Sequence, residues 1–133
     1  MKFSTRSSYG LRAIIHLAKN YQKTPYSLAK IAREEKISLA YLERLFSGLK
    51  SAGLVTSSKG MAGGYQLAKS PSKITVFSVI KALEGQMSVF HCLNEKGEIF
   101  CGQKCCPSVK VYQKVQKAIA DSLQSMTLKD LIK

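Results

Sequence analysis

Three amphipathic helical segments followed directly by a glycine-rich hairpin pattern constrain the fold more than any other feature of the sequence. Apolar side chains recur at helical spacing over residues 9–21 and again over the short segment 28–35. Ser27 is in position to cap the second segment, and residues 36–38 have the composition of a turn after it. The pattern therefore predicts a first supporting helix and a shorter second helix that ends at a tight turn.

The third predicted helix spans residues 39–52 and has clear signals at both ends. Ser38 can act as its N-cap, and Gly53 can adopt the left-handed conformation that ends a helix. Its apolar stripe consists of Leu42, Leu45, Phe46 and Leu49. Two short helices joined by a tight turn, the second exposing polar groups near its N-terminus, form the helix-turn-helix arrangement that enters the major groove of DNA.

A hairpin pattern follows this third helix. Residues 54–59 and 65–67 have the composition of two short strands, and Gly60-Met61-Ala62-Gly63-Gly64 separates them. The glycine-rich segment lacks the GxxxxGK[ST] pattern of a phosphate-binding loop and does not open a helix. A hairpin in this place is a wing, and Lys59 at its base could reach phosphates or the minor groove. The predicted fold is mainly α with a small β-hairpin wing, a winged helix-turn-helix.

The distribution of charge agrees with a DNA-binding first half. The chain of 133 residues carries a formal charge of +13, from 21 Lys and Arg against 8 Asp and Glu. Residues 1–70 hold 12 Lys and Arg against 3 Asp and Glu, whereas residues 71–133 hold 9 against 5. An excess of this size favours polyanionic partners. We therefore expect residues 1–70 to bind double-stranded DNA and residues 71–133 to form an effector and dimerisation region.

Length and hydropathy exclude several other classes of protein. A chain of 133 residues is too short for a large catalytic architecture, and we expect no enzyme activity. The N-terminal residues do not resemble a signal peptide, and no apolar run approaches the about 20 residues of a membrane-spanning helix. These features predict a soluble, cytoplasmic protein without a membrane partner. His16 has apolar neighbours on the first helix, so we expect it to be structural.

All four cysteines fall within residues 92–106 of the second half. Eight residues separate Cys92 from Cys101, three separate Cys101 from Cys105, and Cys106 follows directly. Without a signal peptide, such clustering indicates a metal or redox site more than a set of disulfides. Thiolates suit iron–sulfur clusters or zinc, but the spacing matches neither a CxxC…CxxC zinc pair nor a ferredoxin. The residues alone leave cluster, zinc and thiol chemistry open.

A long amphipathic helix is predicted over residues 108–123. Its apolar stripe consists of Val111, Tyr112, Val115, Ala118, Ile119 and Leu123. The stripe repeats about every 3.5 residues, which favours pairing with the same helix of a second subunit. The alternative is that this helix packs on the core of its own chain.

Short fragments along nearly the whole chain carry a family resemblance. They include Tyr9-Gly10-Leu11-Arg12-Ala13, Ile37-Ser38, Tyr41-Leu42-Glu43, Ala52-Gly53-Leu54-Val55, Gly63-Gly64-Tyr65, Ile74-Thr75-Val76, Ala82-Leu83-Glu84-Gly85 and Thr127-Leu128-Lys129-Asp130-Leu131. In order and spacing they resemble the IscR/NsrR group of bacterial transcription regulators. The resemblance implies a homodimer of winged-helix subunits that binds operator DNA and responds to iron–sulfur status, nitric oxide, redox state or cysteine supply.

The resemblance also implies particular DNA contacts. They fall on Ser38, Ala40, Tyr41, Glu43 and Arg44 in the recognition helix and on Lys59 and Gly60 in the wing. Chemically, Arg44 suits guanine O6 and N7, Ser38 and Tyr41 suit phosphates, and Glu43 can accept from cytosine N4. Lys59 stands where relatives commonly have arginine, which keeps the charge but loses the planar fork.

Many members of the group hold an iron–sulfur cluster on three cysteines of the loop before the dimerisation helix. Carried over to this chain, the ligands fall on Cys92, Cys101 and Cys106, because Tyr112 stands six residues after Cys106, where relatives have an aromatic residue. Relatives often space their cysteines five and five, whereas this chain has eight and then four. Three or four thiolates with no evident carboxylate favour a 4Fe–4S cluster, and a 2Fe–2S cluster is the near rival.

The fourth ligand is left open by the sequence. Val109 and Ser8 stand where some relatives supply a histidine or a carboxylate. Cys105 and His91 are the local candidates, and water or a small thiol could also fill the position. The competing hypothesis is a cluster-free regulator in which Cys105 and Cys106 form a thiol redox switch, or which senses through a protein partner as cysteine-metabolism repressors do. A small iron–sulfur electron carrier is a third alternative.

Overall fold

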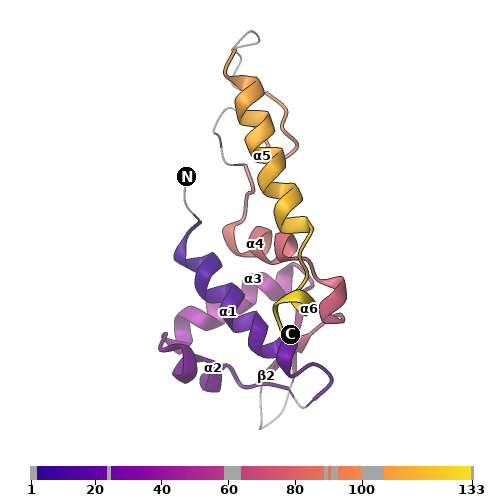
Figure 1. Cartoon of the computed structure of the whole chain (residues 1–133). Helices are drawn as coiled ribbons and strands as arrows, with labels where there is room; N and C mark the ends of the chain where they lie inside the picture. Colours follow the sequence, from indigo (N-terminus) through magenta and orange to yellow (C-terminus); the bar gives the residue numbers. More distant parts are fainter. Residues whose placement is uncertain are drawn as a thin grey trace.

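The computed structural model describes residues 3–23, 25–58, 64–88, 90, 93–99 and 107–132, and this part of the chain is mostly helical with one two-stranded sheet. In chain order the elements are α1 Thr5–Lys19, α2 Leu28–Glu35, α3 Leu39–Ser51, β1 Val55–Ser58, β2 Gly64–Leu67, the 3₁₀ helix η1 Pro71–Lys73, α4 Val76–Glu84, α5 Val109–Gln124 and α6 Leu128–Leu131. Figure 1 shows α1 to α4, the hairpin and α6 gathered together, with α5 extending away from them. The predicted class, mainly α with a β-hairpin wing, is confirmed.

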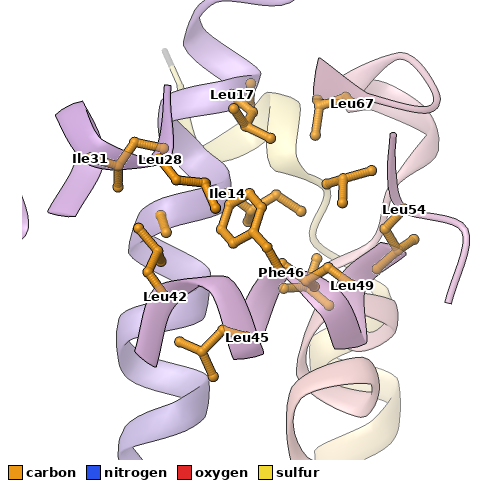
Figure 2. Close-up of a cluster of buried hydrophobic side chains, with 14 of the residues drawn as sticks. Ile14, Leu17, Leu28, Ile31, Leu42, Leu45, Phe46, Leu49, Leu54 and Leu67 are labelled. Atoms are coloured by element: carbon orange, nitrogen blue, oxygen red, sulfur yellow. The ribbon is translucent and has the colours of Figure 1, made fainter. Parts of the chain in front are cut away.

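The core forms where α1, α2, α3 and the hairpin meet. Phe46 and Ile14 are fully buried at its centre, and Leu17, Leu28, Ile31, Leu54 and Leu67 surround them from the other elements, as Figure 2 shows. The four residues predicted for the stripe of α3, Leu42, Leu45, Phe46 and Leu49, are all buried. Burial of a Leu, Ile or Phe side chain contributes about 1.5 to 3 kcal/mol, so this cluster holds α1, α2, α3 and the hairpin together.

The ends of α3 follow the sequence signals. The Ser38 hydroxyl accepts a hydrogen bond from the Tyr41 backbone N–H at 3.0 Å, which is the predicted N-cap. Lys36 in the turn before it and Gly53 after it both have left-handed backbones, with φ of 57° and 77°. These two residues reverse the chain on either side of α3 and fix its direction.

The hairpin is tied to the start of α2. β1 and β2 pair antiparallel from Val55↔Leu67 to Ser58↔Gly64. Tyr26 extends this pairing, because its N–H and C=O each bond Tyr65 at 2.9 Å. A Cβ on Gly64 would lie 2.7 Å from the Tyr26 carbonyl oxygen, so only glycine permits this approach. Ser27 is the N-cap residue of α2, as expected, but its side chain makes no capping hydrogen bond, and the chain enters α2 from the Tyr26 pairing.

The first helix differs from its predicted limits. It begins at Thr5 and ends at Lys19, whereas apolar spacing placed it over residues 9–21. Its first turn, Thr5-Arg6-Ser7-Ser8, is polar and carries no periodic signal. This turn is held by Glu84 of α4, a contact between residues far apart in the sequence.

Residues after the hairpin return to the same core. α4 is capped by Thr75, whose hydroxyl accepts from the Ser78 N–H at 3.1 Å, and it ends at Gly85 with φ of 90°. Ile74, Val79, Leu83 and Leu128 belong to the cluster built by the first half. Helical periodicity did not predict α6, because four residues are too few to show it.

α5 spans Val109–Gln124, close to the predicted 108–123. Its predicted apolar stripe is not covered within one chain, since Gln116 is its one buried residue and Val111 is 59% exposed. None of the described helices is long and apolar enough to cross a membrane.

Candidate nucleic-acid interface and cysteine segment

The N-terminal part of α3 presents most of the predicted DNA contacts to solvent. Ser38, Ala40, Glu43 and Arg44 are exposed, and Tyr41 is half-buried. The buried stripe on the opposite face holds this surface outward. Lys59 and Gly60, the predicted wing contacts, lie outside the described residues. The end of α3 is joined to β1 by a hydrogen bond from Lys50 Nζ to Ser57 Oγ at 2.8 Å, which ties the recognition helix to the hairpin.

Tyr41 joins α3 to the start of α1. Its hydroxyl lies 3.4 Å from Thr5 Oγ1, and its ring packs edge-on against Tyr9 with centroids 6.2 Å apart. The Arg44 guanidinium carbon lies 5.8 Å from the centroid of the Tyr41 ring. The phosphate contact expected for Tyr41 stays a prediction, and its hydroxyl already has one partner within the chain.

The second helix is held to the first by the side chains of Arg12 and His16. His16 Nδ1 lies 3.2 Å from Glu34 Oε2, and its Nε2 lies 3.0 Å from Glu35 Oε1. Arg12 Nε lies 3.3 Å from the other oxygen of Glu35. These pairs join the middle of α1 to the last turn of α2, immediately before the turn that leads into α3.

Glu84 connects α4 to the first turn of α1. Its Oε2 accepts the backbone N–H of Ser4 at 2.9 Å, the Ser4 hydroxyl at 2.8 Å and the Ser7 hydroxyl at 2.6 Å. Arg6 Nη2 lies 3.7 Å from Oε1. Burial raises the pKa of Glu84, but the hydrogen bonds from Ser7 and Ser4 and the charge of Arg6 outweigh it, and the pKa lies below its ordinary value. The carboxylate therefore caps α1 from another helix.

All proposed cluster ligands lie outside the described residues: Cys92, Cys101, Cys105, Cys106 and His91. Within the described parts of the chain, no three His, Cys, Asp or Glu residues are grouped so as to hold a metal ion. Residues 93–99, which lie between Cys92 and Cys101, are described, and they show how the chain runs from one of these cysteines toward the other.

Residues 93–99 form a closed turn between the first two cysteines. Leu93 and Ile99 make an antiparallel bridge, and Leu93 is 1% exposed. The Asn94 side-chain oxygen accepts the N–H groups of Lys96 and Glu98, both at 2.9 Å. Residues 93–99 therefore fold back on themselves.

Two glutamines of α5 hold this turn to the long helix. Gln116 Nε2 donates to the Asn94 carbonyl at 2.8 Å, and Gln113 Nε2 donates to the Gly97 carbonyl at 2.8 Å. These amides are three residues apart and therefore lie on the same side of α5. Phe90 also stacks on Tyr112, with centroids 4.4 Å apart and an interplanar angle of 23°.

Glu95 joins the same turn to α4. One of its oxygens lies 3.2 Å from Lys81 Nζ, and the other accepts the Met87 N–H at 3.2 Å. α4 thus contacts the turn 93–99 through Lys81 and the first turn of α1 through Glu84. Sequence reasoning missed Glu84, Glu95 and Gln116 as site residues. The one signal available in the sequence was Gln116, a polar residue beside the predicted apolar stripe of α5.

Comparison with known proteins gives the family. The profile of the Rrf2 family, described as an iron-dependent transcriptional regulator, matches residues 3–133. The HTH-type transcriptional regulator CymR of Bacillus subtilis is 37% identical over 131 residues, covering 98% of this chain and 89% of that protein. The HTH-type transcriptional regulator IscR of Vibrio campbellii is 35% identical over 133 residues, covering 100% and 78%.

Solved structures agree with these sequence relatives. The structure of CymR, the global cysteine regulator of B. subtilis, superimposes with a TM-score of 0.82 at 36% identity and covers 99% of this chain and 96% of that chain. The oxidized form of Staphylococcus aureus CymR has a TM-score of 0.79 at 35% identity, with 100% and 97% covered. These relatives are regulators and not enzymes, which confirms the predicted class. The chain belongs to the Rrf2 family of transcriptional regulators.

Proposed function

We propose that the chain acts as a homodimer that binds operator DNA through α3 and the wing, and that it senses its signal through an iron–sulfur cluster held by Cys92, Cys101 and Cys106. Residues 1–70 would form the DNA-binding domain, and residues 71–133 would supply the cysteine segment 91–107 and the dimer contact. This proposal has three parts, and a separate set of contacts supports each.

The DNA-binding part is supported by the arrangement of α2, α3 and the hairpin. α3 exposes Ala40, Glu43 and Arg44 on the face opposite its buried stripe, and Ser38 is exposed at its N-cap. The same half of the chain carries 12 Lys and Arg against 3 Asp and Glu. A recognition helix places such side chains against base edges while surrounding cations contact phosphates.

The dimer part is supported by the uncovered face of α5. Val111 is 59% exposed, and Tyr112, Val115, Ile119 and Leu123 are only half-buried in one chain. Apolar residues that recur along one face of a helix need a partner surface. The same helix of a second subunit supplies a matching stripe, and a two-fold dimer presents two α3 helices to a palindromic operator.

The observation that carries the cluster proposal is the Leu93↔Ile99 bridge. Leu93 directly follows Cys92, and Ile99 stands two residues before Cys101. Antiparallel partners have Cα atoms about 4.5 to 5.5 Å apart. Leu93 and Ile99 therefore lie close together, although eight residues separate Cys92 from Cys101 in the sequence. The stacking of Phe90 on Tyr112 supports Cys106 as the third ligand. Phe90 stands two residues before Cys92, and Tyr112 stands six residues after Cys106.

Thiolates are suitable ligands for the cluster, which would give the protein sensitivity to iron, oxygen or nitric oxide. Cys105 or His91 would complete the set, and a ligand set of mainly thiolates with no evident carboxylate is our ground for proposing 4Fe–4S over 2Fe–2S. Contacts within this chain would then transmit a change in the cysteine segment 91–107 to the neighbouring helices. Gln113 and Gln116 hold the turn 93–99 to α5, and Glu95 holds it to Lys81 of α4. A change in this turn therefore bears on both the dimer helix and α4.

A second candidate is a cluster-free regulator with a thiol switch at Cys105 and Cys106. The similarity to CymR, a cysteine regulator whose S. aureus form has been solved oxidized, favours this candidate. The two hypotheses differ in which thiols matter. A cluster needs Cys92 and Cys101, whereas a switch between neighbouring thiols needs Cys105.

Anaerobic purification of the wild type and of single Cys→Ser variants tests the assignment. We expect iron and acid-labile sulfide in the wild type, with both lost from Cys92→Ser, Cys101→Ser and Cys106→Ser. Cys105→Ser tests the fourth ligand: it keeps iron if His91 or an external ligand is the fourth, and it loses iron if Cys105 is. A wild type without iron or sulfide, with zinc absent and a reversible change in free thiols on oxidation, would support the thiol switch instead.

A further inference from the structure

A hollow of about 270 Å³ lies between the start of α1, the middle of α3 and α4. Arg6, Tyr41 and Arg44 line it together with Leu45, Gly48, Ala82 and Leu83. The two arginines come from different helices, α1 and α3. Two guanidinium groups beside one hollow favour an anionic ligand.

Arg6 is held in place at one edge of its guanidinium. Its Nε donates to Ser4 Oγ at 3.2 Å, and its Nη2 lies 3.7 Å from Glu84 Oε1. The other Glu84 oxygen is occupied by three donors from Ser4 and Ser7. The Arg6 side chain is 54% exposed, whereas the Glu84 side chain is 12% exposed. A guanidinium has five N–H donors, so several of them stay available toward solvent.

Arg44 supplies the second positive charge. It is exposed, and within the described residues it makes no ion pair with a carboxylate. Its guanidinium lies over the ring of Tyr41 at 5.8 Å, and Tyr41 is fixed in turn by Thr5 and Tyr9. Two arginines against the single carboxylate Glu84 leave the hollow with a net positive charge. The fixed ring of Tyr41 limits the freedom that Arg44 loses on binding an anion.

We propose that Arg6 and Arg44 together grip one phosphate of the operator backbone, with Glu84 as the residue that positions Arg6. The inference rests on the proposed DNA binding. Arg44 shares the exposed face of α3 with Ala40 and Glu43, so the hollow adjoins the predicted groove-reading surface. A planar guanidinium matches two phosphate oxygens at once. This assignment gives Arg44 a backbone role in place of the guanine contact expected from its residue type.

Duplex binding by single and double variants tests the proposal. The probes are a fluorescein-labelled duplex, selected by the wild type from a random pool, and a scrambled duplex of the same length. Arg6→Gln and Arg44→Gln should each weaken binding to both duplexes by the same factor. Log affinity should fall less steeply with log salt, by about 0.9 for each phosphate that the variant no longer binds. Lys114→Gln, which removes an exposed charge from α5, is the matched control and should bind as the wild type does.

A shared phosphate also predicts coupling between the two arginines. The Arg6→Gln/Arg44→Gln double variant should lose less affinity than the product of the single losses, because both arginines bind the same phosphate. A neutral methylphosphonate at one backbone position should weaken the wild type more than it weakens Arg6→Gln, which keeps only the Arg44 contact with that phosphate. Glu84→Gln should weaken binding in the wild-type background but not in the Arg6→Gln background, which a purely structural role would not produce. Arg6→Lys should recover part of the salt dependence.

Several results would overturn the assignment. Arg6→Gln could bind both duplexes as tightly as Lys114→Gln does, or the loss in Arg44→Gln could be confined to the selected duplex, as for a base contact. Release of the duplex by inorganic phosphate at constant ionic strength, from the wild type but not from Arg6→Gln, would show a site for free anions. A wild type that binds no duplex at any salt concentration refutes the proposed function itself.

Discussion

Replacing Glu84 with alanine should destabilise the fold at neutral pH, because one carboxylate joins α4 to the first turn of α1. The substitution removes three hydrogen bonds to a charged acceptor, from the Ser4 N–H, the Ser4 hydroxyl and the Ser7 hydroxyl, at 2.6 to 2.9 Å. Ser4 is half-buried and can bond water afterwards, whereas Ser7 is 3% exposed and loses its partner.

The magnitude follows from these differences. Loss of a helix cap costs about 1 kcal/mol, and leaving a buried hydroxyl without its charged partner adds about 1 to 2 kcal/mol. We therefore expect the free energy of unfolding to fall by about 2 to 3 kcal/mol at pH 7. For a chain of this length that corresponds to a fall in Tm of about 7 to 10 °C.

The effect should depend on pH in one direction only. The pKa of Glu84 is lowered in the folded chain, so its stabilisation is complete above the unfolded value of about 4.5 and is lost as the pH falls through the native value. Urea denaturation of the wild type and Glu84→Ala, followed by circular dichroism at equal protein concentration, measures the difference. The two curves should be well separated at pH 7 and should approach each other as the pH falls through the lowered pKa of Glu84.

A matched control separates this contact from a general effect of charge. Glu43→Ala removes an exposed carboxylate and should change the free energy of unfolding by less than about 0.5 kcal/mol. The reasoning is refuted if Glu84→Ala costs no more than Glu43→Ala at pH 7. It is equally refuted if the cost of Glu84→Ala is the same at acid and neutral pH.

Three further substitutions test other contacts. Val111→Glu places a charge on the uncovered stripe of α5, and light scattering should show a monomer with weaker duplex binding; an unchanged dimer mass contradicts the role given to α5. Gln116→Leu leaves the Asn94 carbonyl without its donor and should cost about 1 to 2 kcal/mol with faster amide exchange in residues 93–99, whereas unchanged exchange there contradicts the clamp. Gly10→Ala puts a Cβ 2.5 Å from the Leu83 methyl carbons, and thermal unfolding should show a loss of about 1 to 3 kcal/mol unless Leu83 moves freely.

The parts of the fold that local chemistry decides were predictable from the sequence. Ser38, Gly53, Thr75 and Gly85 act at helix ends through their own side chains or backbone freedom. The stripe of α3 was predictable because burial on one face repeats every three to four residues. For the same reason the limits of α5 were nearly correct.

Contacts between distant residues were not predictable. The start of α1 depends on Glu84, which lies 80 positions from Ser4. Serine is a residue type that commonly caps helices, yet the Ser27 side chain makes no capping hydrogen bond. The pairing of Tyr26 with Tyr65 sets the entry to α2 instead. Neither contact has a local pattern, because each arises only once α4 or the hairpin has packed.

The candidate site was predictable in part. The exposed residues of α3 were expected from the helix-turn-helix pattern, and the structure leaves Ser38 at the N-cap and Ala40, Glu43 and Arg44 on the outer face exposed. The contacts that hold residues 93–99 to α5 and α4 were not expected. Gln116 bonds the Asn94 carbonyl and Glu95 pairs with Lys81, and the spacing of these residues in the sequence does not indicate that they meet. The assignments of Cys92, Cys101 and Cys106 stay predictions.

The most direct test of the account is the affinity of one anaerobic preparation for its selected duplex before and after removal of bound iron. The account predicts iron and sulfide in the starting protein and a change in duplex affinity of about 5- to 150-fold when they are removed, the range of a coupling of about 1 to 3 kcal/mol. The change should be much smaller in Glu95→Gln, where the contact of the turn with Lys81 is weakened. Protein that carries a cluster but binds the duplex equally well without it would contradict the proposed mechanism.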